Sequence, residues 1–241
     1  MIYLLGDVHG DWRKITYLCK NLTKNDIVIQ LGDHGINYYG TGQDDHLKKK
    51  IAKLNCTFIF ITGNHDRRAE HFKNYSLVDI DIKDTIKGKF YYNGHYPNQY
   101  FCPMYSLFEV CKKTFLNISG SYSVDKYYRI MNGWNWFEDE QLSINEQNDI
   151  LEKIEIDNVW KNPDYVLTHT CPLRYQPTHL FLNGIDQSKV DITMEKFLNI
   201  IEKKINYKHW FLGHYHATER LWEKGLMLFE DLISLKELEN E

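Results

Sequence analysis

The sequence predicts an α/β protein in which two mixed β-sheets pack against each other and are flanked by helices. The first seventy residues alternate apolar runs of strand length with amphipathic stretches, which is typical of parallel strands joined by helices. Residues from about 75 to 125 form short aromatic and β-branched runs between turn residues, as in antiparallel strands. Because 43% of the 241 residues are hydrophobic and we see no linker or repeat, we expect one domain over residues 1–241, with an aromatic-rich insertion at about 75–140.

Three apolar runs are expected to form the first parallel strands, at residues 2–7, 26–33 and 57–64. They are rich in Ile, Val, Leu and Phe and almost uninterrupted, as expected for strands that are buried on both faces. The stretches 12–22 and 44–54 between them place apolar residues at helical spacing. This part of the chain is therefore predicted to be a βαβαβ unit.

The rest of the chain is predicted to mix short strands with two longer helices. Short strands, some with adjoining loops, are expected at 88–94, 98–110, 114–123, 164–170 and 209–216. Helices are expected at 142–154 and 191–205. Ser143 and Glu146 have the spacing of a capping box at the start of the first of these helices. The segment 217–235 is predicted to close the fold as a hairpin that turns near Gly225.

Charge and composition narrow the possible partners. The 29 basic and 33 acidic residues give a formal net charge of -4, so no global basic field favours nucleic acid, although a local patch is still possible. The aromatic run from Phe90 to Tyr105 has two interpretations, a stacking platform for bases or the core and edge of a β-sheet, and its alternation favours the sheet. The N-terminal apolar run is short and has no basic flank, so we expect no membrane span and a cytoplasmic protein.

Polar side chains of the metal-ligand type follow the ends of several predicted strands. They are Asp7 and His9 in "GDVHG", Asp33 in "LGDHG", Asn64 and His65 in "GNHD", His169 in "THT", and His214 and His216 in "GHYH". Because the carboxyl ends of parallel strands meet at one edge of a sheet, a single crevice can receive them. This mixture of carboxylate, amide and imidazole suits Mn, Fe, Zn or Co better than Mg. The candidates outnumber the ligands of one tetrahedral ion, so we expect two divalent ions.

The order of these motifs resembles that of the calcineurin-like metallophosphoesterases, and in particular of their bacterial and phage members. That superfamily carries D-x-H, G-D, G-N-H-D/E, H and G-H-x-H in this order, and the chain has "DVH", "GD", "GNHD", "THT" and "GHYH". The motifs extend from residue 7 to residue 216, so the resemblance spans nearly the whole chain. It implies the four-layer α/β/β/α sandwich of the superfamily.

The resemblance also implies a role for each residue. Asp7, His9 and His216 look like ligands of one ion, Asn64, His169 and His214 look like ligands of the other, and Asp33 looks like the bridge. His65 resembles the family histidine that lies beside the bound phosphate, where it stabilises charge or protonates the leaving oxygen. Asp66 resembles its orienting partner. The implied reaction is the attack of metal-activated water on a phosphate ester, with no covalent intermediate on the enzyme.

Other residues are candidates for binding the substrate. Arg129, in the stretch 120–143 that also resembles bacterial and phage relatives, is the first candidate for a contact with phosphate. His34 follows Asp33, and Arg67 follows "GNHD". For the arginine after "GNHD" a solvent-facing helical position is the competing interpretation, and for the 120–143 stretch a packed insertion is the alternative.

One departure from the resemblance bears on the substrate. Protein serine/threonine phosphatases and symmetrical diadenosine tetraphosphatases carry an arginine in a D-R-G motif shortly after the bridging aspartate, and this chain reads "GDHGINYYG" there. We therefore expect a phosphoesterase that acts on a small-molecule or nucleotide substrate. A protein phosphatase or nuclease of the same chemistry and an inactive metal-binding scaffold are the alternatives.

Overall fold

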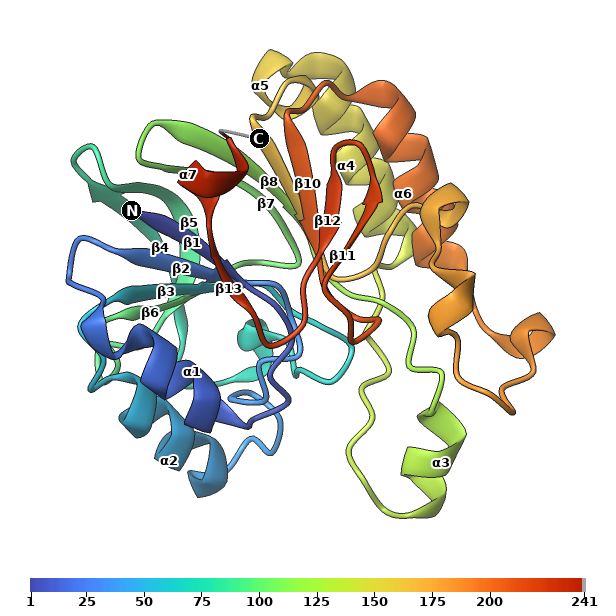
Figure 1. Cartoon of the computed structure of the whole chain (residues 1–241), viewed down its shortest axis with the longest axis horizontal. Helices are drawn as coiled ribbons and strands as arrows, with labels where there is room; N and C mark the ends of the chain where they lie inside the picture. The colour runs from blue at the N-terminus through green and yellow to red at the C-terminus, as the bar shows by residue number, and fades with distance from the viewer. Residues whose placement is uncertain (240–241) are drawn as a thin grey trace.

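The computed structural model describes residues 1–239 and has a mixed α/β fold built on one large, curled β-sheet (Figure 1). One half of the sheet has the order β6-β3-β2-β1-β13, in which all neighbours are parallel except β1 and β13. Its strands are β1 (Ile2–Leu5), β2 (Ile27–Gln30), β3 (Thr57–Phe60), β6 (Gln99–Phe101) and β13 (Leu232–Ser234). The predicted βαβαβ unit is confirmed, because β1, β2 and β3 are parallel and α1 and α2 connect them.

The other half has the order β7-β8-β9-β10-β12-β11, with parallel pairing from β8 to β12 and an antiparallel strand at each end. Its strands are β7 (Tyr105–Val110), β8 (Lys113–Ile118), β9 (Tyr165–Thr168), β10 (His209–Leu212), β11 (Glu219–Trp222) and β12 (Gly225–Met227). The predicted closing hairpin is shorter than expected and comprises β11 and β12 only. The chain then crosses to the other half, where β13 pairs with β1.

The two halves are joined into one sheet, whereas the sequence predicted two. The connection is β5 (Ile86–Tyr92), whose end at Tyr91 and Tyr92 pairs with β6 and whose beginning at Ile86 and Lys87 pairs with β7. The remaining strand, β4 (Ser76–Ile82), pairs with β5 as a hairpin. Because one seven-residue strand pairs with a different neighbour at each end, the sheet bends there without a break in its hydrogen bonding.

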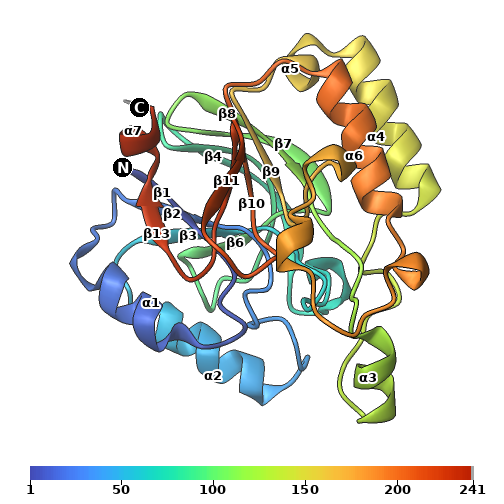
Figure 2. The same ribbon diagram turned by 45° about the vertical axis from the view of Figure 1, so that its right-hand side comes forward.

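Helices cover the outer faces of both halves (Figures 1 and 2). The helices are α1 (Trp12–Leu18), α2 (Gly42–Ile51), α3 (Lys126–Met131), α4 (Ile144–Ile156), α5 (Asn158–Lys161), α6 (Thr193–Lys204) and α7 (Leu235–Leu238). The helices α1 and α2 pack on the first half, and α4 and α6 pack on the second. The predicted capping box at the start of α4 is confirmed, because the Ser143 hydroxyl accepts from Glu146 N and the Glu146 carboxylate accepts from Ser143 N.

The core between the two halves is built from alternate strand residues. Ile29 of β2 packs against residues from both halves, whereas its neighbour Val28 packs outward under α1 and α2. Phe90 and Tyr100 are buried in the central core, so the β-core interpretation of the aromatic run is confirmed for them. No helix among residues 1–239 combines the length and the apolar character that a bilayer crossing requires.

A buried carboxyl group on α6 makes the stability depend on pH. Glu195 is 3% exposed; its Oε1 accepts from Thr170 Oγ1 at 2.8 Å, and its Oε2 is buried with no hydrogen-bond partner. Burial raises the pKa of Glu195 to about 7 from its ordinary 4.5, although the hydrogen bond from Thr170 opposes the shift. The folded state therefore holds this proton more tightly than the unfolded state does.

We expect the free energy of unfolding to fall as pH rises from about 4.5 to about 7, because over this range the Glu195 carboxyl loses its proton in the unfolded chain while the folded state keeps it. The Glu195 contribution to this fall is on the order of 3 kcal/mol. Glu195→Gln is expected to remove it, so the stability of the variant changes less over this range in urea titrations at several pH values. A curve parallel to that of the parent protein would contradict the assignment.

Candidate metal centre

The predicted ligands lie just beyond the carboxyl ends of five strands. Asp7 and His9 follow β1, Asp33 follows β2, Asn64 follows β3, His169 follows β9, and His214 and His216 follow β10. The first three strands belong to one half of the sheet and the last two to the other. Because the sheet curls, its two halves bring these ends to one place.

The backbone at several of these positions is in the left-handed region. The φ angles of His9, Asp33, His214 and His216 are 45°, 52°, 74° and 54°. Such angles are uncommon for residues with a side chain, and they are concentrated at functional sites because the surrounding structure must hold them there. Each of these turns redirects the chain at a strand end, so that the side chain faces the shared crevice.

Two glycines allow the carboxylates to approach the backbone closely. A Cβ atom at Gly63 would overlap Asp33 Oδ1, and one at Gly213 would overlap Asp7 Oδ1. These contacts explain why glycine stands beside the ligand-type residues in "GNHD" and "GHYH".

Gly213→Ala is expected to weaken metal binding at least about tenfold, because the added methyl group displaces the carboxylate of Asp7. Calorimetric titration with Mn²⁺ measures the effect. Gly94→Ala is the matched control, since a Cβ there meets no atom within 4 Å. Equal affinities in the two variants would show that the position of Asp7 does not matter for the ion.

One group of ligand atoms gathers around the side-chain oxygen of Asn64. His169 Nε2 lies 3.0 Å from Asn64 Oδ1, and His214 Nδ1 lies 3.1 Å from it. His169 Nδ1 lies 2.8 Å from the Leu31 carbonyl oxygen, to which it donates, so Nε2 is the unprotonated nitrogen of the neutral ring. Two lone pairs then face each other at 3.0 Å, an arrangement that needs a proton or a cation between them. These atoms therefore fit a cation site.

A second group consists of Asp7, His9 and His216. The Nε2 atoms of His9 and His216 are 2.8 Å apart, and they lie 3.9 and 3.8 Å from Asp7 Oδ2. The Asp7 carboxylate is fully buried and accepts from the backbone N–H of His214. This group also has the donor set of a divalent ion site.

Asp33 lies between the two groups. Its Oδ1 is 3.4 Å from His169 Nε2, and its Oδ2 is 3.8 Å from His9 Nδ1. The Oδ1 atom also accepts from the backbone N–H of His65 at 2.8 Å, which fixes the carboxylate. Asp33 therefore forms one cluster of possible ligand atoms with Asp7 and His169 and another with His9 and His65.

Burial and mutual charge set the protonation of these residues. Burial and the neighbouring imidazoles lower the pKa of His214 well below its ordinary value and that of His216 to about 4, which leaves both rings neutral at pH 7. Burial also lowers the pKa of His169, but the carboxylates of Asp33 and Asp7 outweigh it and raise the value to about 10. A proton on His169 and a divalent cation compete for the same lone pair, so ion binding is expected to release a proton.

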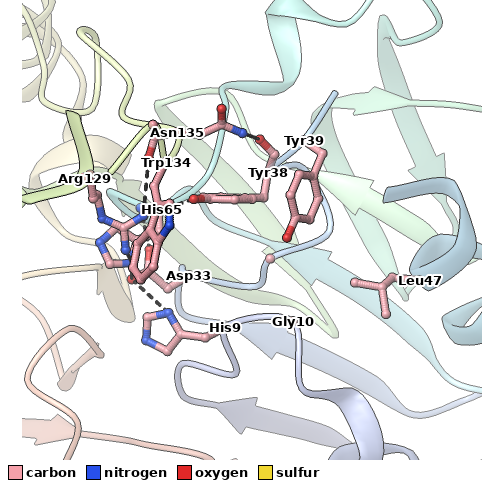
Figure 3. Close-up of a pocket in the computed structure, with 12 residues that line it drawn as sticks. His9, Gly10, Asp33, Tyr38, Tyr39, Leu47, His65, Arg129, Trp134 and Asn135 are labelled. Atoms are coloured by element: carbon pink, nitrogen blue, oxygen red, sulfur yellow. Dashed lines mark hydrogen bonds and ion pairs between the residues drawn. The ribbon is translucent and has the colours of Figure 1, made fainter. Parts of the chain in front are cut away.

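His65 lies beside this cluster, on the wall between two cavities. The Trp134 cavity has a volume of about 620 Å³ and is lined by His9, Asp33, Tyr38, Tyr39, His65, Arg129 and Trp134, among others (Figure 3). The Phe181 cavity has a volume of about 380 Å³ and is lined by Asn64, His65, Phe181, Ile185, His214 and His216, among others. Asp33 and His65 line both cavities, so the candidate metal centre opens into each of them.

Arg129 and Asp125 hold the ring of His65. Arg129 Nη2 is 3.1 Å from His65 Nδ1, and Asp125 Oδ1 is 3.5 Å from His65 Nε2. Arg129 also donates to Asp125 Oδ2 at 2.8 Å and to the Tyr38 hydroxyl at 3.2 Å. Burial raises the pKa of Asp125, but the facing imidazole of His65 and the hydrogen bond from Arg129 outweigh it and bring the value to about 2. Arg129 was a candidate for a contact with phosphate, and the structure places it, together with Asp125, at His65.

Two residues expected in the pocket lie outside it. Asp66 accepts from the backbone N–H groups of His34, Gly35 and Gly63, and so ties the loop after β2 to the loop after β3. The expectation that Asp66 orients His65 is wrong, because Asp125 occupies that position. The ring of His34 is buried between Asp66 and the rings of Phe60 and Phe101, and it lines neither cavity.

The segment after "GNHD" also differs from expectation. The segment forms a turn and a short 3-10 helix (Ala69–His71) instead of an α-helix. Arg67 lies over the ring of Phe137 and lines neither cavity. Arg68 is buried and pairs with Glu146 Oε1 at 2.7 Å, so it anchors α4 and does not face solvent.

Sequence reasoning missed the residues that orient Asn64. Its Nδ2 donates to Ser123 Oγ at 2.9 Å, and Ser123 in turn donates to the buried carboxylate of Glu140. Ser121 Oγ donates to Asn64 Oδ1 at 2.9 Å. These bonds fix the amide so that its oxygen faces the two histidines. The "SYS" spacing, which places both serines on one side of an extended segment, was the available signal.

Comparison with known proteins agrees with this geometry. None of the curated proteins compared with the chain is a significant match. The family profile described as calcineurin-like phosphoesterase matches residues 1–218, which include every candidate ligand and His65. The chain therefore belongs to the calcineurin-like phosphoesterase family.

Proposed function

We propose that the chain hydrolyses a phosphate ester of a small molecule or nucleotide at a centre of two divalent ions, within the four-layer α/β/β/α sandwich of its family. The observation that carries the proposal is the convergence of lone pairs around Asn64 Oδ1 and around the His9–His216 pair, with Asp33 between them. When bound, such ions acidify water into a nucleophile and neutralise the charge of the phosphate oxygens. Mn, Fe, Zn and Co are the ions that this donor set favours.

The residues around His65 supply the rest of the chemistry. A guanidinium group only donates hydrogen bonds, so Nδ1 of the neutral His65 ring accepts from Arg129 and Nε2 carries the hydrogen. Asp125, facing Nε2, favours this tautomer and holds the plane of the ring. His65 is thus positioned to transfer a proton to the oxygen of the departing alcohol. Arg129 presents positive charge at the wall of the Trp134 cavity, where it can pair with the oxygens of a phosphate.

Arg129 thereby compensates for the arginine that is absent after Asp33. Arg129→Ala is expected to lower kcat/KM by about 10²-fold, and Arg129→Lys to recover only part of the loss, because lysine cannot reproduce the forked contacts. Steady-state kinetics with 4-nitrophenyl phosphate measures both variants. Arg13→Ala, at a fully exposed arginine outside the site, is the control and should match the parent protein. Full recovery of activity by Arg129→Lys would show that a positive charge is sufficient at this position and that the forked contacts are not needed.

The proposal as a whole is tested by hydrolysis of 4-nitrophenyl phosphate and bis(4-nitrophenyl) phosphate by protein reconstituted with Mn²⁺. We expect turnover that disappears after chelation and returns with added Mn²⁺. The ratio of the two rates distinguishes a phosphatase from a phosphodiesterase or nuclease. Stoichiometric metal without turnover of either ester would reject the proposal and favour a metal-binding scaffold.

A further inference from the structure

The Phe181 cavity is a second, chemically distinct compartment beside the candidate metal centre. Its apolar wall comes from one segment that precedes α6, through Leu180, Phe181, Leu182, Ile185 and Val190. This segment contains short 3-10 turns, Thr178–Leu180 and Gln187–Lys189, and no regular strand or long helix. A volume of about 380 Å³ is within the usual range of small-molecule sites.

The apolar wall is joined directly to the candidate ligands. The ring of Phe181 is nearly parallel to that of Tyr215, at 19° and a centroid distance of 6.4 Å, and Tyr215 lies in the chain between His214 and His216. Leu182 lines the same cavity although its side chain is 62% exposed. A group bound against this wall would cover apolar surface within reach of the metal centre, which favours binding.

The charges around the cavity define what it can accept. Four carboxyl groups line it, on Asp33, Asp125, Asp191 and Glu195, but Asp33 is a candidate metal ligand and burial raises the pKa of Glu195 to about 7. The described lining residues include no lysine or arginine. The Trp134 cavity, in contrast, contains Arg129. Away from the metal centre, an anionic group would meet the carboxylates of Asp125 and Asp191 and no lysine or arginine of the cavity, whereas an uncharged group would meet the apolar wall.

We propose that the Phe181 cavity binds the organic part of the substrate, and that this part is an uncharged, largely apolar group such as a ring system. The inference rests on the proposed phosphoesterase activity and narrows it to a substrate class. It predicts discrimination against esters whose alcohol carries a further phosphate or a carboxylate. Phe181 and Ile185 are then specificity-determining residues.

Three esters of primary alcohols test the inference: 2-phenylethyl, 2-hydroxyethyl and 2-carboxyethyl phosphate. The reacting phosphate and the leaving oxygen are closely similar in all three, so kcat/KM reports mainly the remote group. With the Mn²⁺-loaded protein we expect the phenyl ester to exceed the hydroxyl ester by about a hundredfold, and the carboxylate ester to be the poorest.

Variants locate the discrimination. Ile185→Ala and Phe181→Ala are each expected to reduce the phenyl-to-hydroxyl ratio at least about tenfold. Ile200→Ala, at a 47% exposed position on α6 that lines neither cavity, is the matched control and should keep the ratio of the parent protein. Phe181 and Ile185 are two independent positions on the apolar wall, so one variant still tests the ratio if the other fails to fold.

The outcomes separate this inference from the proposed function. Turnover of all three esters without preference for the phenyl ester, or a preference that both variants retain, would overturn the assignment of the cavity and leave the phosphoesterase intact. Efficient hydrolysis of the carboxylate ester would overturn the charge argument. Absence of turnover with every ester, including 4-nitrophenyl phosphate, would overturn the proposed function and this inference together.

Discussion

His65→Ala is expected to lower kcat by about 10²- to 10⁴-fold while the metal content stays that of the parent protein. The reason is positional: the ring is held by Arg129 and Asp125 beside the candidate ligands and faces both cavities. The variant should be assayed with 4-nitrophenyl phosphate, and its metal content measured by elemental analysis in parallel.

His46→Ala provides the control, because His46 is exposed on α2 and has no place in the proposed chemistry. A loss of metal together with activity in His65→Ala would mean that His65 is a ligand. This alternative has a structural basis, because His65 Nδ1 lies 3.3 Å from Asp33 Oδ2. Unchanged turnover would remove His65 from the mechanism.

Asp33→Asn is expected to cost at least one bound ion and about 10³-fold or more in kcat/KM, because the bridging role proposed for Asp33 needs both carboxylate oxygens and the negative charge. The amide keeps the shape of the side chain and an oxygen that can accept from the backbone N–H of His65. Elemental analysis and Mn²⁺ titration distinguish the loss of an ion from misfolding, which circular dichroism checks separately.

Asp157→Asn is the matched control. Asp157 is an exposed N-cap of α5, where asparagine caps a helix about as well as aspartate. If Asp33→Asn bound two ions with the parent affinity, Asp33 would have no bridging role, and the assignment of two neighbouring ion sites would fail with it.

The candidate ligands were accessible to sequence reasoning because their positions follow from strand direction. Parallel strands place their carboxyl ends at one edge, so Asp7, Asp33 and Asn64 could be brought together before any coordinates were known. The loop contacts around them were not accessible in this way. Asp66 follows His65 in the chain, yet the turn sends its carboxylate to backbone N–H groups, and Asp125 reaches His65 from a remote segment.

The continuity of the sheet was hidden for a related reason. The pattern of Ile86–Tyr92 predicts a strand, but it does not reveal that each end of β5 has a different neighbour. That pairing depends on how the two halves meet in space. The role of Glu140 was hidden in the same way. Glu140 accepts a hydrogen bond from Ser123, which in turn accepts one from Asn64, and no sequence motif marks this chain of contacts.

The origin of the ligands in both halves of the sheet has a consequence for stability. His9 and His216, 207 positions apart in the chain, belong to one candidate ion site, and Asn64 and His214, 150 positions apart, to the other. An ion that binds only the folded chain adds to its stability, by about 2.7 kcal/mol at a hundredfold excess over its Kd. Bound ions would thus link the first and last parts of the polypeptide, and removal of the metal would lower the stability of the fold as well as stop the reaction.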